Sequence, residues 1–369
     1  MSRARRLRVA VVFGGRSAEH AISCLSAGSV LAAIDRERFD VLPIGITAEG
    51  RWVLAADDPT ALAGRGRELP AVDPTGMALT LPGDPTAKGL VVLEPGGVVQ
   101  LGDVAEELGA IDVVFPLLHG CYGEDGTLQG LLELAGVPYV GSGVFASAAA
   151  MDKHHMKQLL SIAGLAVPPY VVARRGRPVP VEVHELGLPV FVKPARGGSS
   201  IGISKVNTLD ELEAALAEAH RHDPKALVEQ FCAGREVECG VLVGTDGRPE
   251  ASLPAEVRVT GGQDFYDFEA KYLTEATEFD IPPRLPADVV ERIRAMAVNA
   301  FEALDCEGLA RVDFFVSEAG DVVVNEVNTM PGFTPQSMFP RMWDATGVPY
   351  SQLVSRLLDD ALRRGSGLR

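Results

Sequence analysis

Carboxylate and amide side chains are concentrated in the segment 309–332, which reads LARVDFFVSEAGDVVVNEVNTMPG. Apolar residues alternate with Arg311 and Asp313 in its first half, and this period of two predicts a strand with one polar face. Glu326 and Asn328 repeat that spacing in the second half. Two carboxylates and an amide oxygen suit Mg²⁺, which takes oxygen ligands and shares its shell with substrate phosphates. The segment therefore predicts a metal-binding β-hairpin, and the alternative is a solvated polar face.

The turn after Val316 decides which side chains of this hairpin meet. We expect Val316 to pair with Asp321, because the residues between them are typical of a turn. That register puts Arg311 opposite Glu326. Asp313 then becomes the diagonal neighbour of Glu326 on the same face, at roughly 7 Å or less.

A lysine and a glycine-rich loop predict a second site, for phosphate. Lys193 ends a predicted strand, and the loop Arg196-Gly-Gly-Ser-Ser-Ile-Gly202 follows it. Loop amides without bulky side chains can surround phosphate oxygens. The loop is not a Walker A sequence, and its alternative is a simple hairpin turn. With a metal hairpin elsewhere in the chain, the pattern favours binding of a nucleoside triphosphate. Adenine and ribose would then be met by groups that close the next strand, namely Glu229, Gln230, Cys232 and Glu236.

Composition limits the partners of the chain. It has 369 residues, of which 47% are hydrophobic and 23% charged, so we expect a globular protein of two or three domains. Its 34 basic and 50 acidic residues give a net charge of −16. This balance disfavours nucleic acid and anionic membranes as partners, and an anionic substrate must meet a local basic pocket.

Cysteine usage and hydropathy favour a cytoplasmic location. The chain has five cysteines, an odd number without a CxxC pair, and they stand mostly in apolar runs, which is typical of reduced and buried thiols. The apolar run after the basic residues 1–6 is too short for a signal sequence. The chain also contains no apolar run of 18 residues.

Alternating strand and helix patterns predict an α/β fold. Strands are expected at 9–13, 41–46, 112–118, 190–193 and 226–229, and helices at 26–34, 144–162 and 289–304 with one more near the C-terminus. A capping box at Thr208-Leu-Asp-Glu211 predicts a further helix start. Residues 55–97 are rich in Pro and Gly, which predicts a loop-and-hairpin insertion.

A dinucleotide fingerprint competes with the phosphate loop. Gly141-Ser-Gly-Val-Phe-Ala146 fits G-x-G-x-x-G/A and precedes a predicted helix. The carboxylate that would bind ribose about 20 residues later has no Asp or Glu candidate near position 161. A nicotinamide site is therefore disfavoured.

Taken together, these motifs resemble the ATP-grasp superfamily and, within it, the D-alanine–D-alanine ligases. The resemblance covers nearly the whole chain and depends on eight ordered segments: GGRSAEHAISCLSAGS (14–29), PLLHGCYGEDGTLQGLLELAGVPYVGSG (116–143), MDK (151–153), VKPARGGSSIG (192–202), DFYDFEAKY (264–272), RVDFF, NEVNTMPG and SMFP. It implies an ATP-grasp fold with an N-terminal open α/β sheet domain. We expect residues 1–141 to carry the first D-alanine site, 142–235 the phosphate loop, and 236–369 a mobile loop and the metal site.

In that family ATP phosphorylates one D-alanine, and the amine of a second attacks the acylphosphate to give a dipeptide for peptidoglycan. The resemblance implies that Glu19 and His119 hold the first D-alanine, and that Glu19 also links to Ser199 and Tyr272. Without the resemblance, Glu19 would be read as a carboxylate favoured by a helix N-terminus and His119 as a core histidine.

The resemblance also assigns the charged groups. Lys153, Lys193 and Lys271 would neutralise ATP phosphates beside Gly198, Ser199 and Ser200, although three exposed lysines are the simpler interpretation. Arg311 and the amide of Gly332 would stabilise the tetrahedral oxyanion. Metal ligands would be Asp313, Glu326 and Asn328, holding two Mg²⁺ or Mn²⁺ ions, and a monovalent cation requirement stays open.

The second substrate and the assembly state follow from the same resemblance. Ser337 would receive the carboxylate of the second D-alanine beside Met338, whereas Ser337 alone would pass for a helix cap. Related depsipeptide ligases resemble this chain but have histidine where it has Tyr272, so we expect a dipeptide product. The loop 264–272 would close over the acylphosphate. A homodimer is implied.

Two alternatives remain. One is a related ligase that uses D-serine or D-lactate as its second substrate. The other is a nucleotide-binding regulatory module without turnover, which would have no need for an oxyanion arginine such as Arg311. Gln230 departs from some relatives, which have lysine there, and this difference bears on nucleotide affinity alone.

Overall fold

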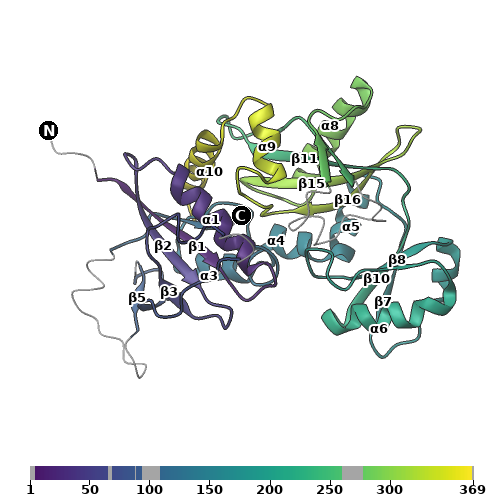
Figure 1. Cartoon of the computed structure of the whole chain (residues 1–369), viewed down its shortest axis with the longest axis horizontal. Coiled ribbons are helices and arrows are strands. Elements are labelled where there is room, and N and C mark those ends of the chain that lie inside the picture. The colour runs from purple at the N-terminus through teal and green to yellow at the C-terminus, as the bar shows by residue number, and fades with distance from the viewer. Residues whose placement is uncertain (1–4, 65–68, 88, 94–108, 260–276, 368–369) are drawn as a thin grey trace.

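The computed structural model describes residues 5–64, 69–87, 89–93, 109–259 and 277–367, and these form three sheets with helices packed on them (Figure 1). The mixed α/β class predicted above is confirmed. Each sheet is built from one stretch of the chain, and the site lies where the three stretches meet.

The N-terminal sheet has the order β5-β4-β3-β2-β1-β6. Its strands are β1 (Leu7–Gly14), β2 (Phe39–Ile46), β3 (Trp52–Leu54), β4 (Ala78–Thr80), β5 (Val91–Val92) and β6 (Val113–Pro116). β1 pairs in parallel with both β2 and β6, and helices α1 (His20–Ala33) and α3 (Thr127–Ala135) lie in this part of the chain. Parallel strands covered on both faces are apolar throughout, which explains why β1 reads as a continuous hydrophobic run. β3 to β5 extend this sheet with antiparallel pairs, so the described part of the Pro/Gly-rich insertion forms a sheet edge.

The central sheet has the order β7-β10-β8-β9 and is antiparallel. Its strands are β7 (Tyr170–Arg174), β8 (Val190–Pro194), β9 (Ser204–Val206) and β10 (Lys225–Gln230). Helix α6 (Leu212–His222) packs on it, preceded by the 3-10 turns Val181–Leu186 and Leu209–Glu211. The capping box predicted at Thr208 and Glu211 is present.

The expected single helix over 144–162 is wrong. The chain forms α4 (Val144–Met151) and α5 (Lys153–Ile162), and Asp152 interrupts them with an extended ψ of 98°. The Asp152 carboxylate accepts hydrogen bonds from the amides of His154 and His155, so it caps α5. A capping Asp prefers non-helical backbone, and the interruption starts a new helix with Lys153 in its first turn.

The C-terminal sheet has the order β14-β13-β11-β15-β16, and β12 pairs with β11. Its strands are β11 (Arg235–Val243), β12 (Pro249–Ala251), β13 (Ala255–Val259), β14 (Thr277–Asp280), β15 (Leu309–Val316) and β16 (Val322–Asn328). Helix α8 (Ala287–Ala303) covers one face through a buried apolar cluster. The opposite face of β11 and β15 carries polar residues, and α9 (Met338–Ala345) contacts β11.

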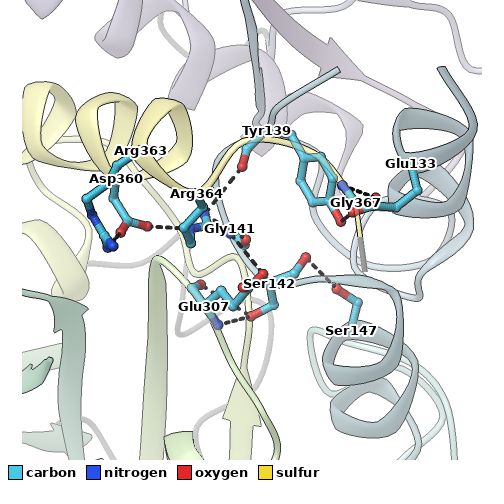
Figure 2. Close-up of polar contacts among 10 residues, drawn as sticks. All are labelled: Glu133, Tyr139, Gly141, Ser142, Ser147, Glu307, Asp360, Arg363, Arg364 and Gly367. Atoms are coloured by element: carbon cyan, nitrogen blue, oxygen red, sulfur yellow. Dashed lines mark hydrogen bonds and ion pairs between the residues drawn. The ribbon is translucent and has the colours of Figure 1, made fainter. Parts of the chain in front are cut away.

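Helix α10 (Tyr350–Arg364) is the last helix of the described chain; it packs on the N-terminal sheet, and its Arg356 also pairs with Glu250 on β12 of the C-terminal sheet. Its apolar face shares one core with β1, α1 and Phe115. Figure 2 shows the last turn: Arg364 is paired with Asp360 and Glu307 and donates to the carbonyls of Tyr139 and Gly141. The C-terminal helix is therefore fixed to the segment that leaves the N-terminal domain.

The three stretches match the expected domain ranges in order, while the boundaries themselves stay a prediction. All five cysteines are free, and Cys121 is exposed although we expected buried thiols, because it lies in the loop after β6. Among the described residues, no helix is long and apolar enough to cross a membrane.

Replacing Leu357 with alanine tests the packing of α10. Leu357 is fully buried in the core shared with the N-terminal sheet. Its loss leaves a cavity, and we expect the free energy of unfolding to fall by about 2 to 5 kcal/mol in a denaturant titration. Leu134→Ala is the control, since Leu134 is 66% exposed. Equal effects of the two substitutions would contradict the packing of α10 described here.

Candidate active site

The register of the hairpin β15–β16 differs from the prediction. Val316 pairs with Val322, and Asp313 lies directly opposite Glu326, so the expected pairing with Asp321 is wrong. The pairing shifts between Asp313 and Phe314, which leaves Asn325 as an extra residue on β16. The two carboxylates are thus closer than the diagonal arrangement we expected, because a directly opposed pair is the nearest cross-strand pair.

The extra residue decides which face the acidic residues occupy. Val322 and Val324 are buried on the core side of β16, and strict alternation would put Glu326 there too. The bulge at Asn325 changes the alternation, so that Val327 is buried and Glu326 faces the same side as Asp313. A sheet irregularity therefore assembles the polar face.

A cluster of four side chains holds this face together. The Arg311 guanidinium donates to both oxygens of Asp313 at 2.7 Å and lies 3.2 Å from Glu238 Oε2 on β11. Asn328 Nδ2 donates to Asp313 at 3.0 Å. Burial opposes the charge of Arg311, but Asp313 and Glu238 outweigh it and hold its pKa well above the usual value.

Two lysines share one buried carboxylate on the nucleotide side. Lys193 Nζ lies 2.6 Å from Glu229 Oε1, and Lys157 Nζ lies 2.9 Å from Glu229 Oε2. The strands β8 and β10 place Lys193 and Glu229 on one face, since Lys193 pairs with Leu227. Burial alone would raise the pKa of Glu229, yet the two ammonium groups hold it below its usual value. Glu229 is therefore charged, and each of its two carboxylate oxygens pairs with one lysine.

The glycine-rich loop lies against the start of α5. Lys153 Nζ donates to the Gly197 carbonyl at 2.8 Å. Ser199 and Ser200 adopt positive φ angles of 53° and 58°, a conformation that side chains rarely take, and such backbone is typical of loops shaped for a ligand. The lysine and the loop face one cavity.

Glu19 joins the N-terminal domain to this loop. Ser199 Oγ donates to Glu19 Oε1 at 2.5 Å. A Cβ at Gly198 would lie 3.0 Å from Glu19 Oε2, and a Cβ at Gly120 would lie 2.7 Å from it. Glycine at these two positions lets the carboxylate approach both backbones.

His119 is buried, and both of its ring nitrogens are engaged by the protein. Nδ1 lies 2.9 Å from the Met330 carbonyl and Nε2 lies 3.1 Å from Ser26 Oγ. Burial lowers the pKa of His119, so the ring is neutral. Both ring nitrogens are therefore already hydrogen-bonded within the protein. His119 lines the cavity, and its contact with the Met330 carbonyl fixes the loop that contains Met330.

Glu124 was missed from the sequence, although it stands in the motif Gly123-Glu-Asp-Gly126. Its Oε2 accepts from the Gly120 amide at 2.7 Å and its Oε1 accepts from the Met330 amide at 2.9 Å. It therefore ties the loop after β6 to the loop before Gly332. Burial, and then the charge of Glu19, raise the pKa of Glu124 to about 8.

Ser337 precedes α9 but does not cap it with its hydroxyl. Its Oγ instead lies 2.9 Å from Thr334 Oγ1 and accepts from the Thr334 amide at 3.1 Å. A Cβ at Gly332 would lie 3.2 Å from Ser337 Oγ, and Gly332, Ser337 and Met338 line the same cavity as Glu19.

Two adjoining cavities contain these groups. The first is about 300 Å³ and is lined by Glu19, His119, Arg311, Gly332 and Ser337 among others. The second is about 240 Å³ and is lined by residues expected to bind the nucleotide, including Lys193, Ser200, Gln230, Cys232 and Glu236. Lys153, Gly198, Ser199, Glu238 and Glu326 line both cavities. An amino acid in the first cavity would thus lie next to a nucleotide in the second.

Gln230 and Cys232 are placed by backbone contacts at the end of β10. The side-chain Nε2 of Gln230 donates to the Leu186 carbonyl at 2.9 Å, and the backbone amide of Gln230 donates to the Pro169 carbonyl. Cys232 is half-buried, and both residues line the second cavity.

Three predicted features lie outside the described residues: Lys271, Tyr272 and the rest of the loop 264–272. Glu238 and Lys157 were missed as well as Glu124. Glu238 pairs with Arg311 on β15, and Lys157 pairs with Glu229 on β10. In the sequence, the one pattern that pointed to Glu238 was the alternation of Glu236 and Glu238 along a strand.

The donor set suits a hard cation. Glu326 lies opposite Asp313, and both carboxylates and the Asn328 amide share one face beside the cavity that contains Lys193. Oxygen donors next to a phosphate-binding cavity fit Mg²⁺ or Mn²⁺.

Comparison with known proteins gives consistent matches along the chain. The family model described as D-ala D-ala ligase N-terminus matches residues 8–142, and that described as D-ala D-ala ligase C-terminus matches 159–359. The D-alanine–D-alanine ligase of Rhodococcus opacus (strain B4) is 59% identical over 371 residues, covering 99% of each chain.

Solved structures agree with the fold. VanG D-Ala:D-Ser ligase from Enterococcus faecalis superposes with a TM-score of 0.81 at 34% identity, covering 97% of this chain and 100% of that one. The D-alanine–D-alanine ligase from Bacillus anthracis complexed with ATP gives 0.71 at 27% identity, covering 97% and 98%.

The raised pKa of Glu124 predicts a pH-dependent stability. Its pKa is about 8 in the native chain against 4.5 ordinarily, so the native state keeps a proton that the unfolded chain releases. This contribution is complete below about pH 4.5 and is lost as the pH rises through about 8. We expect the thermal midpoint of the wild type to fall relative to that of Glu124→Gln between about pH 5 and pH 9. A constant difference between the two melting curves would contradict the assignment.

Proposed function

The chain belongs to the D-alanine–D-alanine ligase family, and from this premise we propose how its residues carry out the reaction. The activity is ATP-dependent joining of two D-alanine molecules into D-alanyl-D-alanine, a precursor of peptidoglycan in cell wall biogenesis. The observation that carries the residue assignments is the junction of two cavities, one bordered by Glu19 and Arg311 and the other by the lysine-bearing loop.

ATP occupies the second cavity. Lys153 and Lys193 neutralise its phosphates, and the amides at Gly198, Ser199 and Ser200 bind phosphate oxygens. A chain of net charge −16 needs such a local positive site for a polyanion. Glu229, Gln230 and Cys232 provide backbone groups to adenine, and Glu236 provides a carboxylate to ribose. Lys271 joins the phosphate ligands.

The first D-alanine lies in the first cavity with its ammonium at Glu19. Ser199 holds the Glu19 carboxylate through the 2.5 Å hydrogen bond, and Tyr272 completes this link. His119 borders the amino acid and fixes the Met330 loop. The carboxylate of the substrate then points to the phosphates, where one of its oxygens attacks the γ-phosphorus and ADP leaves.

The second half of the reaction forms the peptide bond. The amine of the second D-alanine, after losing a proton, attacks the carbonyl carbon of D-alanyl phosphate; a C–N bond forms, the C–O bond to phosphate breaks, and phosphate leaves. Arg311 and the Gly332 amide stabilise the negative oxygen of the tetrahedral intermediate. Ser337 binds the carboxylate of the incoming D-alanine, with Met338 beside it.

Asp313, Glu326 and Asn328 hold Mg²⁺ or Mn²⁺, in two ions. These three residues would hold the metal, which would supply positive charge to offset the negative charge on the phosphates. Asp313 would contribute to the metal site while it pairs with Arg311, and Arg311 lines the first cavity, where its guanidinium would meet the reacting carbonyl. A monovalent cation requirement stays open, and we propose that the enzyme works as a cytoplasmic homodimer.

Tyr272 makes the dipeptide the main product. A histidine at this position accompanies D-lactate use in the depsipeptide ligases that this chain resembles, and here the residue is tyrosine. A D-Ala:D-Ser ligase also superposes well, so D-serine must be included as a second substrate.

Phosphate release from ATP and Mg²⁺ tests the activity. The amino-acid mixtures are D-alanine, L-alanine, D-alanine with D-serine, and D-alanine with D-lactate, with products identified by mass. We expect dipeptide from D-alanine alone and none from L-alanine. Depsipeptide as the main product with D-lactate would overturn the role given to Tyr272, and mainly D-alanyl-D-serine would favour the related-ligase alternative. Intact ATP binding without turnover in any mixture would favour the regulatory alternative.

Arg311→Ala tests the oxyanion assignment. Loss of one oxyanion donor should reduce kcat by about 10² to 10³. ATP affinity should stay near normal, because Arg311 lines the first cavity and not the second. Arg235→Ala, which removes an exposed arginine of the same sheet, is the matched control. Full activity of Arg311→Ala would remove the assignment.

A further inference from the structure

Lys157 is a buried lysine to which the reaction above gives no role. It lies one helical turn after Lys153 on α5, and its side chain is 1% exposed. Burying an ammonium group is costly unless it is paired and hydrogen-bonded. The groups that contact Lys157 should therefore explain why a lysine is buried at this position.

The first contact is with the carboxylate that also binds Lys193. Glu229 lies between the two ammonium groups, 2.9 Å from Lys157 and 2.6 Å from Lys193. Glu229 and Lys193 alone would form a neutral pair. With Lys157 the three groups carry one net positive charge, and of the two lysines only Lys193 borders the nucleotide cavity.

The second contact is with the bulge. Lys157 Nζ donates to the Asn325 carbonyl at 3.2 Å, and the preceding residue, Met156, accepts from the Val327 amide through its sulfur at 3.3 Å. Consecutive residues of α5 thus bond the carbonyl of the bulged residue and a backbone amide two positions after it. This bulge turns Glu326 toward Asp313.

We propose that Lys157 is a positioning residue for the nucleotide and its metal. Its ammonium shares the charge of Glu229, so that Lys193 keeps positive charge for the phosphates, and it fixes the bulge that brings Glu326 and Asn328 to the face of Asp313. This inference rests on the proposed function, because it assumes that ATP and the metal bind at these two places.

Lys157→Met tests the proposal, since methionine fills similar space without charge or donor. Binding is measured without turnover: ADP by calorimetry, and Mn²⁺ by paramagnetic resonance with ADP at saturation. We expect both affinities to fall on the order of tenfold or more. In activity assays the KM for ATP should rise, while the KM for D-alanine should stay within about twofold. Gln158→Met, an exposed change to the same residue on the same helix, should leave all four values unchanged.

The double variant Lys157→Met/Glu229→Gln separates the two effects. A neutral residue 229 no longer cancels Lys193, so ADP affinity should recover to within a few-fold of the wild type. Mn²⁺ affinity should stay low, because the bulge is still unsupported. No recovery of ADP affinity would overturn the charge-sharing part.

A purely structural role gives a different pattern. Lys157→Met would then lower the thermal midpoint and the active fraction, with unchanged ADP, Mn²⁺ and KM values in the folded fraction, and this result would overturn the proposal. If Lys157→Met does not fold, Lys157→Gln is measured with the same expectations. An inactive wild type in every amino-acid mixture would instead refute the proposed function, and the binding measurements remain interpretable in that case.

Discussion

Like charges on neighbouring strands repel, and the site depends on how this chain holds three carboxylates together. Glu238, Asp313 and Glu326 stand side by side on β11, β15 and β16. Arg311 contacts two of them with a buried guanidinium, and such a bidentate pairing is strong and directional. This cation offsets the repulsion between the carboxylates of Asp313 and Glu238. The same face carries the oxygen donors at which we propose that a divalent cation binds.

At the site the three sheets are joined by a few polar contacts, beside an apolar core that the N-terminal and C-terminal sheets share through residues such as Leu309 and Met330. Glu19 reaches Ser199, His119 reaches the Met330 carbonyl, and Glu124 reaches the Met330 amide. Each contact joins residues at least 180 positions apart in the chain. Polar contacts of this kind fix distances between reacting groups, and proximity is where an enzyme that joins two small molecules gains most of its rate.

Residue types could be predicted from the sequence better than their pairing. The alternation around Asp313 identified the strand and its polar face, and the glycine-rich loop after Lys193 lines a cavity, while its binding of phosphate stays a prediction. The register failed because a bulge at Asn325 depends on Lys157 and Met156 of a distant helix, which no local pattern encodes. Glu124 and Glu238 were missed for a related reason. Each is an ordinary carboxylate until the fold supplies an amide or a guanidinium opposite it.

The position of helix α10 has a consequence for synthesis of the chain. The N-terminal sheet is made first, yet part of its apolar surface is covered only by residues near the end of the described chain. Domains commonly fold as they leave the ribosome, beginning from the N-terminus. Phe115, which packs against Phe333, and its neighbours therefore lack part of their cover until Leu353 to Ala361 have emerged. Completion of the core is therefore a late step of biosynthesis. A nascent chain stalled before α10 would expose apolar residues of the N-terminal sheet to chaperones and proteases.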